Sequence, residues 1–353
     1  MATFEVNKFT GAVAIPQQAA QNNQQVVVRQ NDQQQLSKYD GPPRTSDLLA
    51  PTMQLSGHQG EILSAKFHPD GNVIASTGNE RNIYLWNVFG ECENFYIYKV
   101  AHDATILDLK FNTDGSAIFT ASVDKTVGMF DTETGERVKR MKGHKGIVNA
   151  CSVSRRGDQL VASASDDCTV KIWDTRRRHA IKTLQLNYQV TAVCFDDTAQ
   201  NIVTAGIDND VRLWSINSDK APIAMYGHKD TITDLCLSHN GGHALSNSMD
   251  GTLRMWDVRP YSPGERCKSV YYGHKHGFEK NLLKCSWSAD DSLIACGSAD
   301  RLVNVWNVHN RQLIYKLPGH NGSVNDVQFH PKQPIVMSCS SDKEIFLGEL
   351  QVQ

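Results

Sequence analysis

A histidine, a serine and an aspartate lie close together in this chain, and these are the three side chains of a hydrolase catalytic triad. The stretch SASDDCTVKIWDTRRR contains Ser163 and Asp167, and His144 precedes it. The same stretch ends in three consecutive arginines, which could contact a phosphate backbone. The chemistry to be decided is therefore nucleophilic catalysis, phosphate binding, or neither.

The same residue types recur along the chain, which argues against a single catalytic site. A Gly-His or Ala-His pair returns about every 42–46 residues, and an aromatic residue follows each pair at a nearly constant distance. One copy has Leu186 instead of histidine, and the last copy has Gly348 instead of the aromatic residue. The histidines are His58, His102, His144, His228, His274 and His320, and the aromatic residues are Trp86, Phe130, Trp173, Trp214, Trp256 and Trp306. Seven such copies with Trp-Asp marks are typical of WD-repeat β-propeller blades.

Short alternating runs inside each repeat predict strands that would position these residues. In the first repeat the runs cover residues 62–67, 73–76 and 83–86, and the turn HPDG separates the first two. Four strands per repeat predict an all-β, seven-bladed WD-repeat propeller over residues 51–353. Because the last repeat ends after its third strand, residues 51–56 should supply the missing outer strand and close the ring.

The repeated polar residues are predicted to brace the blades. They resemble the WD-repeat family, in which the histidine, hydroxyl, aspartate and tryptophan of a blade form a hydrogen-bonded chain. A catalytic triad needs one pocket with an oxyanion hole, whereas this set returns around the ring. The predicted brace residues are His144, Ser163, Asp167 and Trp173 in blade three, His228, Ser246, Asp250 and Trp256 in blade five, and His102, Thr120 and Asp124 in blade two. Blades four, six and seven depart at Leu186, Cys296 and Gly348 and should be either softer or held by other contacts.

Other signatures of catalysis, metal binding or membrane insertion are missing from the sequence. It contains no P-loop, GxSxG, HExxH or paired-glycine dinucleotide turn, so we expect no enzyme activity, cofactor or metal. A net charge of −2 gives no global attraction to nucleic acid or anionic membranes. Nine cysteines without CxxC pairs indicate a reducing compartment, and no apolar run reaches membrane-spanning length.

The first 50 residues differ in composition from the rest. Residues 17–35 are mostly glutamine and asparagine, and residues 41–43 are Gly-Pro-Pro. Such a segment has too little apolar surface to offset the entropy of ordering it. We therefore predict that residues 1–50 form a disordered tail.

Basic residues on exposed turns are the candidate partner surface. The residue after the repeated acid is basic in four blades that adjoin across the ring closure, at Arg301, Lys343, Arg81 and Lys125. This basic arc could contact an acidic protein segment or an RNA backbone, although exposed turns also accept Lys and Arg without any function. On the opposite face, Arg176, Arg177 and Arg178 lack interleaved aromatic residues, which favours a protein contact over RNA base recognition. The long stretches HKHGFEKNLL and RPYSPGERC exceed what the scaffold needs and are further candidates for recognition.

The resemblance extends beyond the repeat. The stretches LSGHQGEILSAKFHPDG, NIYLWNVFGECENFYIYKVAHDATILDLKFNTDG, YGHKDTITDLCLS and PGHNGSVNDVQFHP look like the WD-repeat subunits of the U5 small nuclear ribonucleoprotein. That resemblance implies a nuclear, non-catalytic scaffold in pre-messenger-RNA splicing. It implies large U5 proteins and other spliceosome subunits as partners, with RNA contact indirect or minor and no small-molecule substrate.

Two other functional classes are open at this point. Receptors of cullin-type ubiquitin ligases often carry Trp-Asp-x-Arg, and this chain has the motif twice, ending at Arg176 and Arg259. An enzyme housed in the propeller funnel would need carboxylates or metal ligands that converge on the inner strands. We do not expect such convergence from the sequence.

Overall fold

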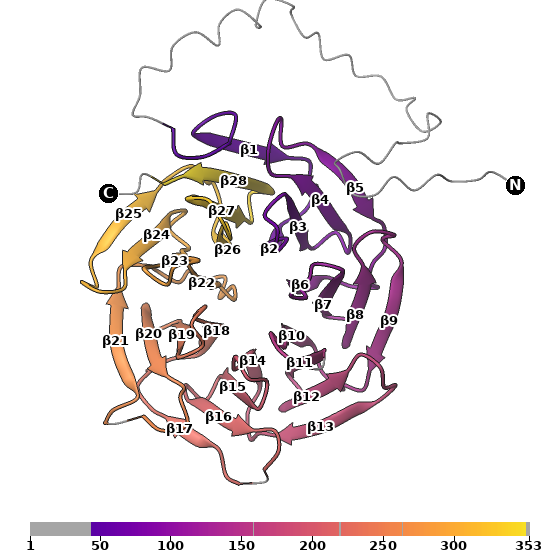
Figure 1. Ribbon diagram of the computed structural model, residues 1–353, viewed down its shortest axis with the longest axis vertical. Coiled ribbons are helices and arrows are strands. Elements are labelled where there is room, and N and C mark those ends of the chain that lie inside the picture. The colour runs from indigo at the N-terminus through magenta and orange to yellow at the C-terminus, as the bar shows by residue number, and fades with distance from the viewer. Residues whose placement is uncertain (1–43, 158, 219, 263, 351–353) are drawn as a thin grey trace, which may run out of the picture. The chain divides into compact units, whose positions relative to one another are not determined.

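The protein folds into a ring of seven four-stranded antiparallel sheets (Figure 1). The computed structural model describes residues 44–157, 159–218, 220–262 and 264–350, and these contain strands and turns but no helix. Among the described residues, therefore, no helix has the length and apolar character to cross a bilayer. The predicted all-β, seven-bladed propeller is confirmed.

The blades follow each other around the ring in chain order, each running from an inner to an outer strand. Blade one consists of β2 (Ile62–Phe67), β3 (Val73–Gly78), β4 (Ile83–Asn87) and β5 (Asn94–Tyr98). Blade two consists of β6 (Ile106–Phe111), β7 (Ala117–Ser122), β8 (Thr126–Asp131) and β9 (Arg137–Lys142). Blade three consists of β10 (Val148–Val153), β11 (Leu160–Ser165), β12 (Thr169–Asp174) and β13 (Ala180–Gln185). Blade four consists of β14 (Val190–Phe195), β15 (Asn201–Gly206), β16 (Val211–Ser215) and β17 (Ile223–Met225). Blade five consists of β18 (Ile232–Leu237), β19 (His243–Ser248), β20 (Thr252–Asp257) and β21 (Cys267–Tyr272). Blade six consists of β22 (Cys285–Trp287), β23 (Leu293–Gly297), β24 (Val303–Asn307) and β25 (Leu313–Leu317). Blade seven consists of β26 (Val324–Phe329), β27 (Ile335–Ser340), β28 (Glu344–Glu349) and β1 (Thr52–Ser56).

Burial changes across each blade in the way the sequence pattern predicts. The middle strand β7, with sequence AIFTAS, is buried on both faces because neighbouring blades cover it. The outer strand β9, with sequence RVKRMK, buries only Met141 fully and exposes two of its four charged residues, Arg137 and Lys142. Apolar side chains between adjacent blades therefore form the core, and the outer strands form a rim that exposes both polar and apolar side chains.

The ring is closed by the N-terminal strand, as predicted. Strand β1 pairs antiparallel with β28, in a register that runs from Thr52 opposite Gly348 to Ser56 opposite Glu344. The amide of Glu349 continues the ladder by donating to the carbonyl of Pro51 at 2.9 Å. The first and last described strands of the chain therefore share one sheet.

The predicted tail boundary at residue 50 is wrong, because residues 44–50 pack on the propeller. Arg44 Nε and the amide of Ser46 donate to the Glu349 carboxylate at 2.7 and 3.0 Å. The Leu48 side chain is buried in the same cluster as Leu55. The propeller unit begins at Arg44, and the rest of the predicted tail, residues 1–43, lies outside the described residues.

Polar side chains on the inner strands tie neighbouring blades together. In most blades the pairing of the inner strand shifts register by one residue. The residue at the shift often bonds the backbone of the next blade: Asn149 Nδ2 donates to Val190 O at 2.9 Å, Thr233 Oγ1 to Leu283 O at 2.9 Å, and Asn325 Nδ2 to Ile62 O at 2.7 Å. These bonds fix adjacent blades against each other and so hold the loops of each face in a constant arrangement.

Candidate partner surface and its supporting frame

The Ser/His/Asp set of blade three lies inside the blade. The Nδ1 of His144 is 2.9 Å from the Asp167 carboxylate, and its Nε2 is 2.7 Å from the Ser163 hydroxyl. The indole of Trp173 donates to the same hydroxyl at 2.9 Å. Ser163 has no exposed surface, so its oxygen cannot approach a substrate. The set satisfies buried polar groups in the way a structural network does.

The predicted residues of blades five and two adopt the same arrangement. The bonds of blade five are His228 to Asp250 at 2.9 Å, His228 to Ser246 at 2.6 Å and Trp256 to Ser246 at 2.8 Å. In blade two, His102 lies 2.8 Å from Asp124 and 2.7 Å from Thr120. Phe130 stands in the tryptophan position and has no N–H to donate, so this network has one member fewer.

Electrostatics within blade three keep the carboxylate charged and the imidazole neutral. Burial would raise the pKa of Asp167, but hydrogen bonds from Thr169, the Lys145 amide and His144 outweigh burial and lower it. Burial lowers the pKa of His144, against the opposing effect of the nearby carboxylate. The imidazole therefore donates from Nδ1 to the carboxylate and accepts the serine proton at Nε2.

Blades four and seven replace the missing members with other contacts. In blade four, where Leu186 stands for histidine, Arg212 pairs with both Asp208 and Asp210. Trp214 still donates to Thr204 at 2.9 Å. In blade seven the ring of Phe346 packs edge-on against His320, with centroids 4.7 Å apart, while Gly348 occupies the register position of the tryptophan.

Blade six has the least complete network. Cys296 replaces the hydroxyl, and Trp306 donates instead to the carbonyl of Tyr272 at 3.0 Å. Among the described residues, neither ring nitrogen of His274 or His276 has a hydrogen-bond partner, nor has Oδ1 of Asp300. Burial lowers the pKa of both histidines to about 4. Blade six therefore lacks hydrogen bonds that blades three and five form.

Carboxylates do converge on the inner strands, contrary to the expectation from the sequence. Asp108, Asp234 and Asp326 each stand six residues after a Gly-His or Ala-His pair, on β6, β18 and β26. Each accepts a backbone N–H from the following blade: Cys151 to Asp108 at 3.0 Å, Cys285 to Asp234 at 2.9 Å, and Ala65 to Asp326 at 3.2 Å. Aligning the repeats on the histidine would have revealed this position.

Lysines pair with two of these carboxylates. Lys66 donates to Asp326 at 2.7 Å, and Lys284 reaches from blade six to Asp108 in blade two. Burial would raise the pKa of Asp108, but the positive charges of Lys284 and Lys110 outweigh the effect of burial and lower this pKa. The Asp108 carboxylate is therefore charged. No group of three or more metal-binding side chains is placed to hold a metal within the described part of the chain. The converging charges thus form cross-links between blades.

The four residues of the basic arc occupy equivalent, strained turn positions. Arg81, Lys125, Arg301 and Lys343 have positive φ values of 63°, 68°, 70° and 75°, and all four are exposed. The other three blades place Cys168, Asn209 and Gly251 there, and glycine and asparagine tolerate this conformation best. Left-handed backbone at an arginine or lysine costs about 1 kcal/mol. The turn chemistry alone would favour glycine at these positions.

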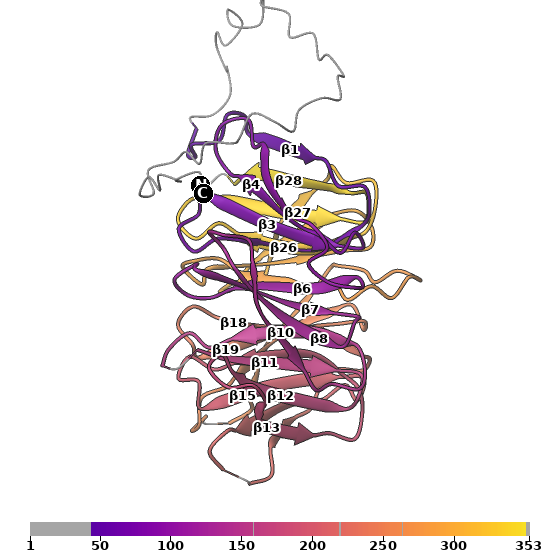
Figure 2. The same cartoon turned by 90° about the vertical axis from the view of Figure 1, so that its right-hand side faces the viewer.

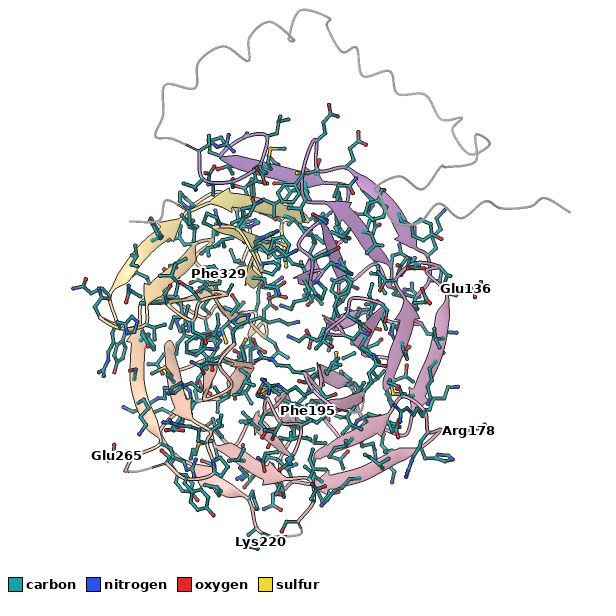
Figure 3. All side chains as sticks on the ribbon, in the orientation of Figure 1. Glu136, Arg178, Phe195, Lys220, Glu265 and Phe329 are labelled. Atoms are coloured by element: carbon teal, nitrogen blue, oxygen red, sulfur yellow. The ribbon has the colours of Figure 1, made fainter. Side chains whose placement is uncertain are left out.

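The remaining predicted arginines lie beyond the third strands of blades three and five. Arg176, Arg177 and Arg178 are exposed, and Figure 3 places Arg178 on the outer rim. Arg177 Nε lies 3.6 Å from Asp174. Arg259 forms a two-pronged bond to the buried Asp257, at 3.0 and 2.6 Å.

The extra residues of blade six form a protruding loop. They precede β22, and Figure 2 shows this orange loop extending from one face of the ring. Phe278 in this loop is fully exposed. Single exposed apolar side chains are common on protein surfaces, so Phe278 alone does not identify a contact site.

The fold and the repeated brace define the class of this protein as a WD-repeat β-propeller. Two family models match the chain: nucleolar protein 10-like, N-terminal domain, over residues 70–347, and WD domain, G-beta repeat, over residues 49–87. The human U5 small nuclear ribonucleoprotein 40 kDa protein is 55% identical over 311 residues, which cover 88% of this chain and 87% of that protein. The chain belongs to the family of WD-repeat propellers that includes this U5 protein, as the sequence resemblance predicted.

More distant relatives agree with this assignment. The Dictyostelium discoideum U5 small nuclear ribonucleoprotein 40 kDa protein is 46% identical and covers 88% of this chain and 88% of its own length. The pre-mRNA-splicing factor cwf17 of Schizosaccharomyces pombe is 41% identical over 87% of this chain and 90% of its own length. The similarity therefore spans nearly the whole propeller.

Proposed function

We propose that this protein is a non-catalytic scaffold of the U5 small nuclear ribonucleoprotein, acting in pre-messenger-RNA splicing in the nucleus. The observation that carries the proposal is the 55% identity to a U5 protein over 88% of the chain. The scaffold binds large U5 proteins and other spliceosome subunits, and its contacts with RNA are indirect or minor.

The internal geometry supports the absence of catalysis. The serine of the best-formed triad-like set is buried between an imidazole and an indole. The carboxylates near the axis accept backbone amides, and two of them also pair with lysines. These groups are engaged in holding the ring together.

The basic arc is the partner surface that we propose on this scaffold. Its four cations occupy turn positions where glycine or asparagine would avoid the cost of a left-handed backbone. This turn position is left-handed in every blade, and the recurrence of a basic residue there in four adjoining blades supports a functional reason for the charges. Their common sign fits an acidic segment of a protein partner.

No comparison supports the ubiquitin-ligase alternative. Arg259, which would complete one of its two motifs, is bound to Asp257 of its own blade. An arginine in that position stabilises the turn after β20. The splicing scaffold is therefore the function that we propose.

Affinity purification from nuclear extract tests the proposed role. We expect the tagged protein to recover U5 RNA together with the large U5 proteins. Recovery of a ubiquitin-ligase adaptor without any U5 component would refute the proposal.

Glycine substitution separates the binding role of the arc from its effect on stability. We expect Arg301→Gly with Lys343→Gly to raise the melting temperature, because left-handed strain is relieved, and to reduce recovery of U5 proteins several-fold. The control Lys99→Gly with Lys220→Gly removes the same charge at two exposed positions outside every candidate partner surface. Unchanged recovery with the arc variant would exclude the arc as the partner surface.

A further inference from the structure

A groove lies on the outer rim between blades four and five. It encloses about 760 Å³ and is bounded by β17 on one side and by β20 and β21 on the other. Strand β17 has three residues, whereas the outer strands of the other six blades have five or six. The short strand leaves part of the facing surface of blade five uncovered. Figure 1 shows β17 and β21 as neighbours on the rim.

The lining of the groove is basic and aromatic. Its cations outnumber its carboxylates four to one: Arg254, Arg266, Lys268 and Arg311 against Glu265. Figure 3 places Glu265 on the rim. Tyr226 and Tyr272 lie on opposite walls and are 72% and 68% exposed. The groove therefore combines a positive potential with two apolar ring faces that solvent now covers.

Arg254 is the most informative residue of the lining. The equivalent arginine of blade four, Arg212, pairs with Asp208 and Asp210. Arg254 instead contacts Cys267 Sγ at 3.8 Å, and its Nε is buried without a partner among the described residues. An arginine so placed, at the floor of a groove, is suited to a carboxylate brought by another molecule.

The long loop of blade five forms one end of the groove and is held in place by hydrogen bonds. Arg266 Nη1 donates to the carbonyls of Asp257 and Arg259 at 2.9 and 3.0 Å. Arg311 Nη2 donates to Lys268 O at 3.4 Å, joining the turn of blade six to β21. The groove is thus largely formed before any partner binds, which lowers the entropic cost of binding.

We propose that this groove binds an extended acidic segment of a protein partner. Its carboxylates pair with Arg254, Lys268 and Arg311, and an apolar side chain packs between the two tyrosines. A peptide fits better than RNA, because Arg254, Arg266 and Arg311 already donate to protein atoms and Lys268 lies 4.0 Å from Asp257. The four cations therefore do not form a continuous exposed track for a phosphate backbone. The inference rests on the proposed scaffold role but concerns a surface separate from the basic arc.

Fluorescence anisotropy on the purified full chain tests the groove. The probe is a dye-labelled twelve-residue peptide of glutamate and aspartate with two central leucines. We expect Lys268→Glu with Arg311→Glu to weaken binding about tenfold or more, since two attractions become repulsions. The matched control, Lys99→Glu with Lys142→Glu, makes the same charge change at exposed rim positions of blades one and two. We expect the control to change affinity less than about twofold.

A second variant protects the test from misfolding. Arg254→Gln removes the cation whose Nε has no partner among the described residues while leaving the surface charge of the rim otherwise intact, and its melting temperature should match wild type. We expect it to weaken peptide binding about fivefold. Equal affinity of wild type and both groove variants would overturn the proposal. So would loss of binding of a ten-nucleotide uridine RNA, but not of the peptide, in the same variants. These binding measurements use only the purified protein. A negative result would therefore reject the groove proposal without affecting the test of the scaffold role by recovery of U5 components.

Discussion

At the scale of single residues, position within the blade decides what a reactive side chain does. Ser163, His144 and Asp167 have the types and the distances of a hydrolase triad. The serine oxygen, however, accepts the indole proton of Trp173 and lies in the interior. The set therefore contributes to stability, with each member satisfying the others.

Removing Asp167 should destabilise the fold without changing any surface. Asp167→Ala leaves His144 and the Lys145 amide without their acceptor, which costs about 1–3 kcal/mol. Thermal denaturation should show a melting temperature lower by several degrees. Asp300→Ala in blade six is the control, because Oδ1 of Asp300 has no partner there, and its effect should be clearly smaller. Equal losses in the two variants would contradict the bracing role.

The two buried histidines of blade six should make stability depend on pH. Burial lowers the pKa of His274 and His276 to about 4, below the value of 6.5 of an unfolded histidine. The folded state thus binds fewer protons than the unfolded state between these values, so stability is full above pH 6.5 and falls as the pH decreases toward 4.

Urea denaturation at pH 7 and pH 5 measures this dependence. We expect His274→Gln with His276→Gln to lose less stability over this interval than wild type, by on the order of 1–2 kcal/mol for each histidine. The exposed His309→Gln should behave as wild type. An identical pH response of wild type and the double variant would show that these two side chains do not titrate on unfolding.

Residue types that recur were predictable, and contacts between distant residues were not. His144, Ser163 and Asp167 could be assigned from the sequence because their spacing repeats in other blades. The pairing of Lys284 with Asp108 could not, because it joins blades two and six across the axis. The sequence period predicts the contacts that every blade has in common. The Lys284–Asp108 pair depends instead on how the closed ring places blades two and six.

At the scale of elements, the segment before β1 belongs to the propeller. Its contacts are hydrogen bonds from Arg44, Thr45 and Ser46 to the carboxylate of Glu349. These bonds hold the pKa of Glu349 at about 2, although burial alone would raise it. A polar stretch bonded to one distant carboxylate has no periodic pattern, which is why composition placed the boundary seven residues too late.

Three N-terminal truncations should show which part of this segment contributes to the stability of the propeller. Deleting residues 1–43 should leave the melting temperature unchanged, since the described contacts begin at Arg44. Deleting residues 1–50 should lower it by several degrees, because Leu48 and the bonds to Glu349 are lost. Deleting residues 1–58 should abolish cooperative folding, because blade seven loses β1. A cooperative, protease-resistant transition in the longest deletion would refute the role of β1 in closing the ring.

At the scale of the whole molecule, charges near the axis connect blades that do not adjoin. Lys284 in blade six bonds both Asp108 and Leu107 O in blade two. Burying such a pair costs desolvation, and breaking one member leaves an uncompensated charge. The period of the repeats predicts the ring, but these cross-links and the groove beside the short β17 follow from three-dimensional closure.

A double-variant cycle should reveal this cross-link. Lys284→Met should cost about 3 kcal/mol or more, because Asp108 loses its buried counter-charge. Adding Asp108→Asn should recover part of that loss, since asparagine still accepts the Cys151 amide without carrying charge. Denaturant unfolding of the two single variants and the double variant gives the coupling. Strictly additive losses would show that the pair does not interact.

Because β1 and β28 pair in one sheet, the ring cannot close during translation until β28 has been synthesised. The ribosome produces β1 almost three hundred residues before β28, its pairing partner. At about 5–20 residues per second, the open edges of the unfinished ring stay exposed for roughly fifteen seconds or more. Nascent chains are thus vulnerable to pairing with one another, and a chain that terminates early cannot retain a working fraction of the ring.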